Sequence, residues 1–98
     1  MLKRKDYPKT FRIGTEDYRI KFVRKFDKGE EDHLADCDPV KHLIRIRVGQ
    51  TDEMNFRCLI HELLHAIGEF EHDTKIPHKL IHALETPFYQ FIRENFFK

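Results

Sequence analysis

The chain has 98 residues, which is enough for one domain and too few for a second hydrophobic core. Hydrophobic residues make up 40% of the chain and charged residues 36%, a composition typical of a globular domain. The formal net charge of only +1 argues against nucleic acid as a partner, and no apolar run approaches the roughly 18 residues of a membrane span. We expect no signal peptide and, with only two cysteines, a cytoplasmic chain without a disulfide framework.

The beginning of the chain predicts a loose arm followed by a β-hairpin. Residues 1–9 are mostly polar and are expected to be loosely held. Phe11 and Ile13 alternate with polar neighbours before a turn-like segment at residues 14–17. The alternation resumes over residues 18–23, and this period of two is typical of strands with one buried face.

The next part of the chain predicts a loop, a turn and a third strand. Residues 25–32 are charged and are expected to form a solvated loop. Residues 36–39, Asp-Cys-Asp-Pro, have the composition of a turn. In residues 43–48, isoleucines and a valine share one face and arginines the other, so a third strand is predicted, ending at Gly49.

A helix is predicted after this strand. Thr51 or Asp52 is expected to cap it, and the acidic residues of the first turn suit the positive end of the helix dipole. Apolar residues then recur three and four positions apart as far as about residues 68–70. These residues are Phe56, Leu59, Ile60, Leu63, Leu64 and Ile67.

The predicted helix contains His61-Glu62-Leu63-Leu64-His65, the HExxH pattern. Residues four apart lie on one helix face, so both imidazoles can reach one metal ion with Zn–N bonds of about 2.0–2.1 Å. Glu62 is offset around the helix and can reach a water bound to that metal, the position of a general base. Chance would give roughly 0.04 matches in this chain, so a metal site is favoured over two ordinary histidines on a buried helix.

A second helix is predicted near the C-terminus. Thr74 is a candidate cap, Pro77 suits the first turn, and Pro87 is expected to kink or restart the helix. Its apolar face consists of Leu80, Ile81, Leu84, Phe88, Phe91 and Ile92. The whole chain, residues 1–98, is therefore predicted as a single α+β domain, in which a small antiparallel or mixed sheet of about three strands precedes two helices.

Two histidines make an incomplete site, because catalytic zinc usually has three protein ligands and one open position. The candidates for the third ligand are Glu71, His72, His78, His82 and Glu85. Gly68 fits the metzincin pattern HExxHxxGxxH, but glutamate occupies the position of its third histidine. Glu85 follows His65 by the twenty residues seen in thermolysin-like gluzincins, without room for their intervening structure. If the two helices pack antiparallel, His78 and His82 lie near His65.

Residues from about 35 to 95 resemble the small HExxH proteins encoded by phages and prophages, which are described as metallopeptidases of the zincin type. The resemblance is carried by residues 36–39, 44–46, 61–67 (HELLHAI) and 89–95. It implies a minimal zincin-like fold, in which a sheet, an active-site helix and one supporting helix remain. Members commonly carry a glutamate pair two residues before an apolar pair at the start of the last helix.

In this chain Leu80-Ile81 matches that apolar pair, which places Pro77-His78 on the glutamates. The resemblance thus favours His78 as the third ligand, ahead of His82 and Glu85, although histidine replaces a carboxylate there. It also implies that the strand at residues 43–48 pairs with an extended peptide as an edge strand, the alternative being an ordinary edge strand with solvated arginines.

The expected function is a zinc-dependent metallopeptidase that cleaves a peptide or protein substrate in the cytoplasm, the host cytoplasm if the chain is phage-encoded. His61, His65 and His78 would hold Zn²⁺, and Glu62 would activate the metal-bound water. The alternative is a non-catalytic zinc-binding module, a phage accessory or interaction protein, for which His72 is a conceivable fourth ligand.

A third class, a nucleic-acid-associated protein that uses Arg45 and Arg47, has little support from the charge balance. The sequence does not predict an oligomeric state.

Overall fold

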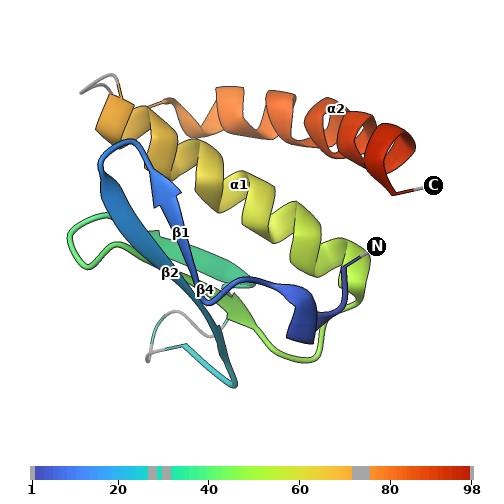
Figure 1. Ribbon diagram of the computed structural model, residues 1–98, viewed down its shortest axis with the longest axis horizontal. Helices are drawn as coiled ribbons and strands as arrows, with labels where there is room; N and C mark the ends of the chain where they lie inside the picture. The colour runs from blue at the N-terminus through green and yellow to red at the C-terminus, as the bar shows by residue number, and fades with distance from the viewer. Residues whose placement is uncertain (1, 27–28, 30–31, 72–75, 98) are drawn as a thin grey trace.

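The computed structural model describes residues 2–26, 29, 32–71 and 76–97 (Figure 1). A short 3-10 turn, η1 (Arg4–Asp6), precedes four strands and two helices. The strands are β1 (Thr10–Ile13), β2 (Glu16–Val23), β3 (Ala35–Asp38) and β4 (Leu43–Arg47). The helices are α1 (Asp52–Glu71) and α2 (His78–Phe96). The predicted α+β class is confirmed.

The sheet is mixed and has the strand order β1-β2-β4-β3. β1 and β2 form the predicted antiparallel hairpin, which turns at Gly14 with a φ of 59°. β2 pairs in parallel with β4, and β3 pairs antiparallel with β4. The alternation seen in the sequence therefore predicted three of the four strands.

The fourth strand, β3, contains residues that were predicted as a turn. Asp36 lies directly opposite Arg45 of β4, and its carboxylate accepts a hydrogen bond of 2.9 Å from the guanidinium Nε and forms an ion pair with it. The turn begins only at Asp38, whose side chain accepts hydrogen bonds from the backbone N–H groups of Val40 (3.0 Å) and Lys41 (3.1 Å). Pairing with the next strand along the chain thus outweighs the local turn signal.

The prediction that residues 43–48 form an edge strand is wrong. β4 lies between β2 and β3, so backbone groups on both of its sides are engaged in the sheet. Arg45 is also not simply solvated, because besides Asp36 it contacts the face of the Phe26 ring at 4.8 Å. The strand at the end of the sheet on this side is β3.

α1 lies between the sheet and α2, so the molecule has three layers (Figure 1). The sheet contributes Tyr18, Ile44 and Ile46, all fully buried, to a core that α1 completes with Cys58 and Ala66. A second, smaller cluster on the other side of α1 consists of Phe56 and Ile60, packed against Tyr89 of α2. α2 runs antiparallel to α1, as the third-ligand argument requires.

The ends of the helices partly follow the sequence. Thr51 caps α1 as expected, since its hydroxyl accepts a hydrogen bond of 3.1 Å from the N–H of Met54. α2 begins at His78 with Pro77 immediately before it, while Thr74 lies outside the described residues. The helix continues through Pro87 without a restart. Pro87 has no N–H group to donate to the carbonyl of Ala83, and both residues are exposed to solvent.

Residues 2–9, expected to belong to a loose arm, are held against the rest of the domain by several contacts. Tyr7 is buried and its ring meets that of Phe22 edge-on at 5.4 Å, and Lys3 pairs with Asp52 at 3.0 Å.

Within the described ranges, no helix combines the length and the apolar character that a membrane span requires.

Candidate metal centre

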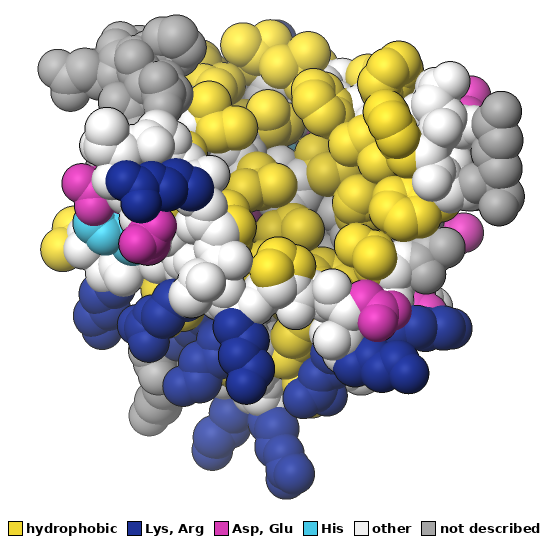
Figure 2. Space-filling model, in the orientation of Figure 1, with side chains coloured by type: hydrophobic (Ala, Val, Ile, Leu, Met, Phe, Trp, Pro, Cys, Tyr) yellow, Lys and Arg dark blue, Asp and Glu magenta, His cyan; other side chains and the backbone are white. Residues whose placement is uncertain are grey.

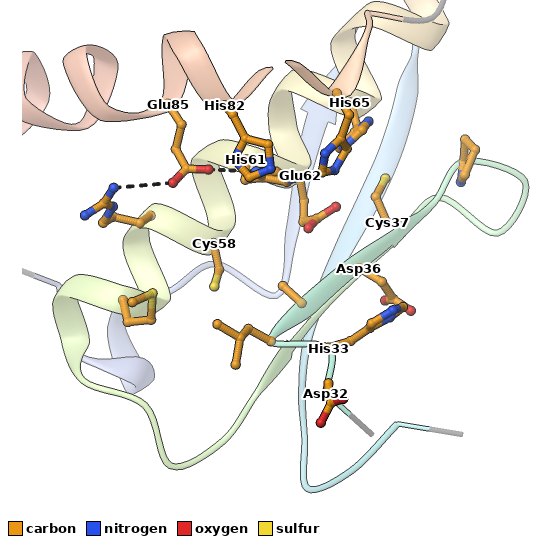
Figure 3. Close-up of a pocket in the computed structure, with 16 residues that line it drawn as sticks. Asp32, His33, Asp36, Cys37, Cys58, His61, Glu62, His65, His82 and Glu85 are labelled. Atoms are coloured by element: carbon orange, nitrogen blue, oxygen red, sulfur yellow. Dashed lines mark hydrogen bonds and ion pairs between the residues drawn. The ribbon is translucent and has the colours of Figure 1, made fainter. Parts of the chain in front are cut away.

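A pocket of about 670 Å³ opens where the beginning of α2 meets α1 and strand β3 (Figure 3). α1 contributes the HExxH residues to its wall, and α2 contributes His78, His82 and Glu85. The opposite wall is formed by the segment Asp32–Leu34 and the first residues of β3. The pocket thus joins the predicted motif to the predicted third-ligand segment.

His61 and His65 lie on the flank of α1 that faces the start of α2. Their ring centroids are 5.1 Å apart, as expected for residues one turn apart on a helix. Both side chains are half-buried, because the apolar faces of α1 turn toward the sheet and toward α2. The sequence prediction was based on the four-residue spacing of these two histidines.

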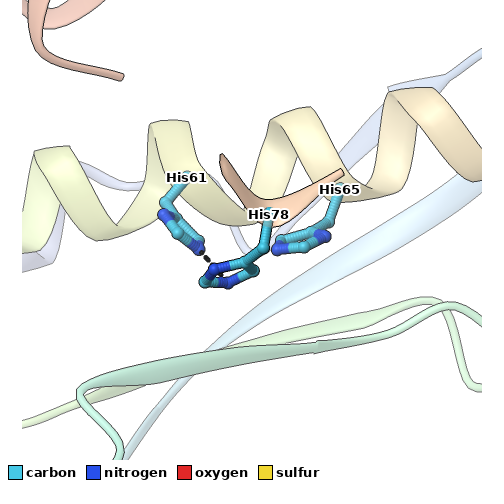
Figure 4. A group of neighbouring side chains, drawn as sticks. All are labelled: His61, His65 and His78. Carbon is cyan, nitrogen blue, oxygen red and sulfur yellow. Dashed lines mark hydrogen bonds between the residues drawn. The ribbon is translucent and has the colours of Figure 1, made fainter. Parts of the chain in front are cut away.

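His78, the first residue of α2, completes a group of three imidazoles (Figure 4). Its Nε2 is 3.2 Å from Nε2 of His61, and its ring centroid is 5.1 Å from that of His65. Each of the three residues offers one nitrogen, and these atoms all lie within 4.8 Å of one another. Two ligands of a tetrahedral zinc ion lie about 3.3 Å apart, so the His61–His78 distance suits a shared metal.

Glu85 holds His61 from the other side of its ring. An oxygen of Glu85 lies 2.7 Å from Nδ1 of His61, and its second oxygen is 3.5 Å from the guanidinium of Arg57. An ionised carboxylate only accepts hydrogen bonds, so Nδ1 of His61 must donate. The lone pair of that imidazole then resides on Nε2, which faces His78.

A second group of possible ligands shares His61 with the first. His61, His82 and Glu85 also offer atoms that lie within 4.8 Å of one another. The ring centroid of His82 is 5.1 Å from that of His61 and 4.7 Å from that of His78. The structure therefore brings together all three of the favoured third-ligand candidates. His72 and the side chain of Glu71 lie outside the described residues.

Partial desolvation and the neighbouring imidazoles of His61 and His82 lower the pKa of His78 from its ordinary value. A lowered pKa favours the neutral imidazole, which is the form that binds a metal. The direction of this shift is thus compatible with a role of His78 as a ligand.

Glu62 is buried, with 7% of its surface exposed, and its carboxylate points into the pocket (Figure 3). Burial, followed by the negative charges of Asp36 and Glu85, raises the pKa of Glu62 to about 7. Among the described residues, none forms a hydrogen bond with this carboxylate. A carboxyl group that titrates near neutrality can both take and return a proton at physiological pH.

Two features of the site were not found from the sequence. Arg57 forms an ion pair with Glu85. It precedes His61 by four residues, the same spacing as between His61 and His65, and this spacing is the signal that could have placed Arg57 on the same flank of α1. Cys37 of β3 and Cys58 of α1 both line the pocket, and burial raises the pKa of Cys58 to about 11. Cys58 is therefore a protonated, unreactive thiol.

Comparison of the chain with protein-family models, with curated proteins and with solved structures finds no match. The resemblance carried by the HELLHAI segment stays a prediction.

Proposed function

We propose that the chain is a zinc-dependent metallopeptidase in which His61, His65 and His78 hold the metal and Glu62 is the general base. One observation carries the proposal. Three imidazole nitrogens from two helices lie within 4.8 Å of one another, beside a buried carboxylate with a pKa of about 7, in a pocket large enough for part of a peptide.

The donor set fits zinc. Zinc accepts imidazole nitrogen readily and is commonly bound by three protein ligands in catalytic sites, with a fourth position left for water or substrate. The contact between Glu85 and His61 matches the carboxylate that usually orients a metal-binding histidine. Three neutral ligands would also leave the full charge of the metal available, which makes it a strong Lewis acid.

The bound metal would polarise the scissile carbonyl and make a water molecule more acidic. Glu62 takes the proton of the attacking water and then gives it to the leaving amine, which a pKa near neutrality permits. Burial keeps bulk water away from its carboxylate. Glu85 and Arg57 hold the His61 ring in one orientation and one tautomer throughout the reaction.

β3 is the part of the sheet best placed to bind an extended peptide. It lies at the end of the sheet, and Ala35, Asp36 and Cys37 line the pocket that contains Glu62. A peptide added along this strand would make backbone hydrogen bonds with little dependence on its sequence, and would pass close to Glu62. The cytoplasmic location and the phage origin remain expectations from the sequence.

The proposal is tested by measuring zinc content and peptide cleavage on the same preparations. The wild-type protein should contain about one zinc per chain, and His61→Ala and His65→Ala should each lose it. Glu62→Gln should keep the zinc but lose cleavage of a peptide library, because only the proton acceptor is removed. His42→Ala, in the turn before β4, is the control. Equal cleavage by wild type and Glu62→Gln would contradict the assigned role.

The alternative, a non-catalytic zinc module, is favoured by one observation. The ring of His82 lies next to those of His61 and His78, although its nitrogens do not join the group that His61, His65 and His78 form. As a fourth protein ligand, His82 would leave no open position. Cobalt substitution combined with X-ray absorption distinguishes the two functions. Three histidine ligands plus water support the enzyme, whereas four protein ligands and no cleavage support the module.

A further inference from the structure

α2 exposes a row of large apolar side chains, which we term the α2 stripe: Leu80, Leu84, Phe88 and Phe91. Their exposed fractions are 48%, 41%, 50% and 57%. Spacings of four, four and three residues place them on one side of the helix. Figure 2 shows the molecule in the orientation of Figure 1. Hydrophobic side chains gather over the half of this view in which the helices run, and Lys and Arg lie mainly toward the opposite edge.

The stripe is exposed because a neighbouring face of α2 packs on α1. Each stripe residue directly precedes an inward residue, about 100° further around the helix. Leu80 precedes Ile81, which is fully buried, and Phe88 precedes Tyr89, which is 4% exposed. Leu84 likewise precedes Glu85, whose side chain holds His61.

Rotation of α2 by about 100° would bury the stripe on α1, but it would carry Glu85 away from His61. His78, whose Nε2 lies 3.2 Å from that of His61, would also leave the site. The orientation that assembles the pocket is thus the one that leaves the stripe uncovered. The histidines and the stripe lie on opposite flanks of the packed face.

We propose that the α2 stripe is the centre of a homodimer interface. Four half-exposed large side chains present on the order of 400 Å² of apolar surface, as much as the largest patch on a typical monomer. A standard interface buries about 800 Å² per partner and has an apolar centre inside a polar rim. The stripe supplies such a centre, and the polar residues beside it on α2 supply part of the rim.

The order of residues along the stripe is self-complementary. When two α2 helices pack antiparallel about a two-fold axis between Leu84 and Phe88, Leu84 of one copy faces Phe88 of the other. In the same register Leu80 lies within one residue of the position opposite Phe91 of the second copy. The directly opposed positions then pair a leucine with a phenylalanine, which keeps the side-chain volume similar along the proposed interface.

Sedimentation velocity of the full chain tests the proposal. Wild type should sediment with twice the mass of one chain at micromolar concentration, whereas Leu84→Lys and Phe88→Glu should each sediment as single chains. An equimolar mixture of the two variants should regain the double mass, because each introduced ammonium group then faces the introduced carboxylate of the other copy. Val40→Lys, at a residue that is 87% exposed and lies outside α2, should leave the mass doubled.

Circular dichroism identical to wild type would show that both variants fold, as expected for changes at exposed positions. A wild-type chain that stays single at every concentration would overturn the proposal and leave the stripe to a different partner. Variants that keep the double mass would overturn it as well. Failure of the mixture to regain the double mass would overturn the antiparallel pairing. None of these results depends on zinc or on peptide cleavage.

Discussion

At the residue scale, the burial that raises the pKa of Glu62 also makes its charged form unfavourable for the stability of the fold. Its pKa is about 7 in the folded chain, whereas the ordinary value is 4.5. Between these values the folded state binds more protons than the unfolded state, so the stability contributed by this group decreases as pH rises from about 4.5 to about 7. A difference of this size corresponds to up to about 3 kcal/mol.

Glu62→Gln should therefore stabilise the metal-free protein above pH 7 by up to about 3 kcal/mol relative to wild type. Below pH 4.5 the two proteins should differ little, because Glu62 is then protonated in both the folded and the unfolded wild type. Urea unfolding of both proteins in chelator at pH 4 and pH 8 measures the difference. Equal effects of the substitution at the two pH values would contradict the assigned burial cost.

The three residues that α2 brings to the site should differ in their effect on zinc affinity. His78→Ala should weaken binding most, since it removes a proposed ligand. Glu85→Gln should cost roughly 10–100-fold, because it removes the carboxylate that orients His61. His82→Ala should change the affinity least. Competition with a chelating dye measures all three. If His82→Ala shows the largest loss, the metal is bound by His61, His82 and Glu85 instead.

At the scale of elements, Gly68 of α1 allows Ile76, two residues before α2, to pack closely against α1. A Cβ atom at this position would lie 2.5 Å from a side-chain carbon of Ile76, which is closer than real Cβ contacts. Gly68→Ala should therefore displace Ile76, and with it His78 two residues further on. We expect a loss of stability of about 1–3 kcal/mol together with weaker zinc binding.

Gly68→Ala combined with Ile76→Ala is the matched control, because it provides room for the added methyl group. The double variant should regain most of the zinc affinity that Gly68→Ala loses. Equal zinc affinity in wild type and the single variant, measured with the same dye, would show that Gly68 does not set the position of α2.

The sequence predicted those elements whose signals are local. Alternation over residues 18–23 and 43–48 needs only neighbouring residues, and both segments are strands. β3 was missed because its pairing depends on contacts such as Asp36 with Arg45, which local composition does not reveal. The same limit explains why β4 was expected at an edge, since strand order is a property of the whole sheet.

Only part of the site could be predicted, because only part of it depends on signals between residues close in sequence. The spacing of His61 and His65 is a local signal, and it predicted that both would lie on one flank of a helix. The apolar period of α2 predicted a helix but not its rotation, because Leu84 and Glu85 lie only about 100° apart. Which of these two faces meets α1 is decided by tertiary contacts, among them the one between Glu85 and His61.

At the scale of the whole molecule, α2 is attached to the domain through α1. The sheet and α1 share the larger core, whereas α2 contributes Tyr89 and Ile92 to a smaller cluster around Phe56 and Ile60. A metal bound by His61, His65 and His78 would add a link between the two helices at the beginning of α2, away from Tyr89 and Ile92. Zinc would thus stabilise the outer layer more than the sheet.

Zinc at about 100 times its dissociation constant should stabilise the fold by about 2.7 kcal/mol, which raises the Tm of a domain this size by roughly 10–20 °C. Because the metal links α2 to α1, its removal should also increase amide hydrogen exchange in α2 more than in β2 and β4. Calorimetry and exchange mass spectrometry, with and without chelator, measure the two effects. His65→Ala is the control and should respond to chelator in neither. An exchange increase confined to the sheet, with α2 unchanged, would exclude a metal that joins the two helices.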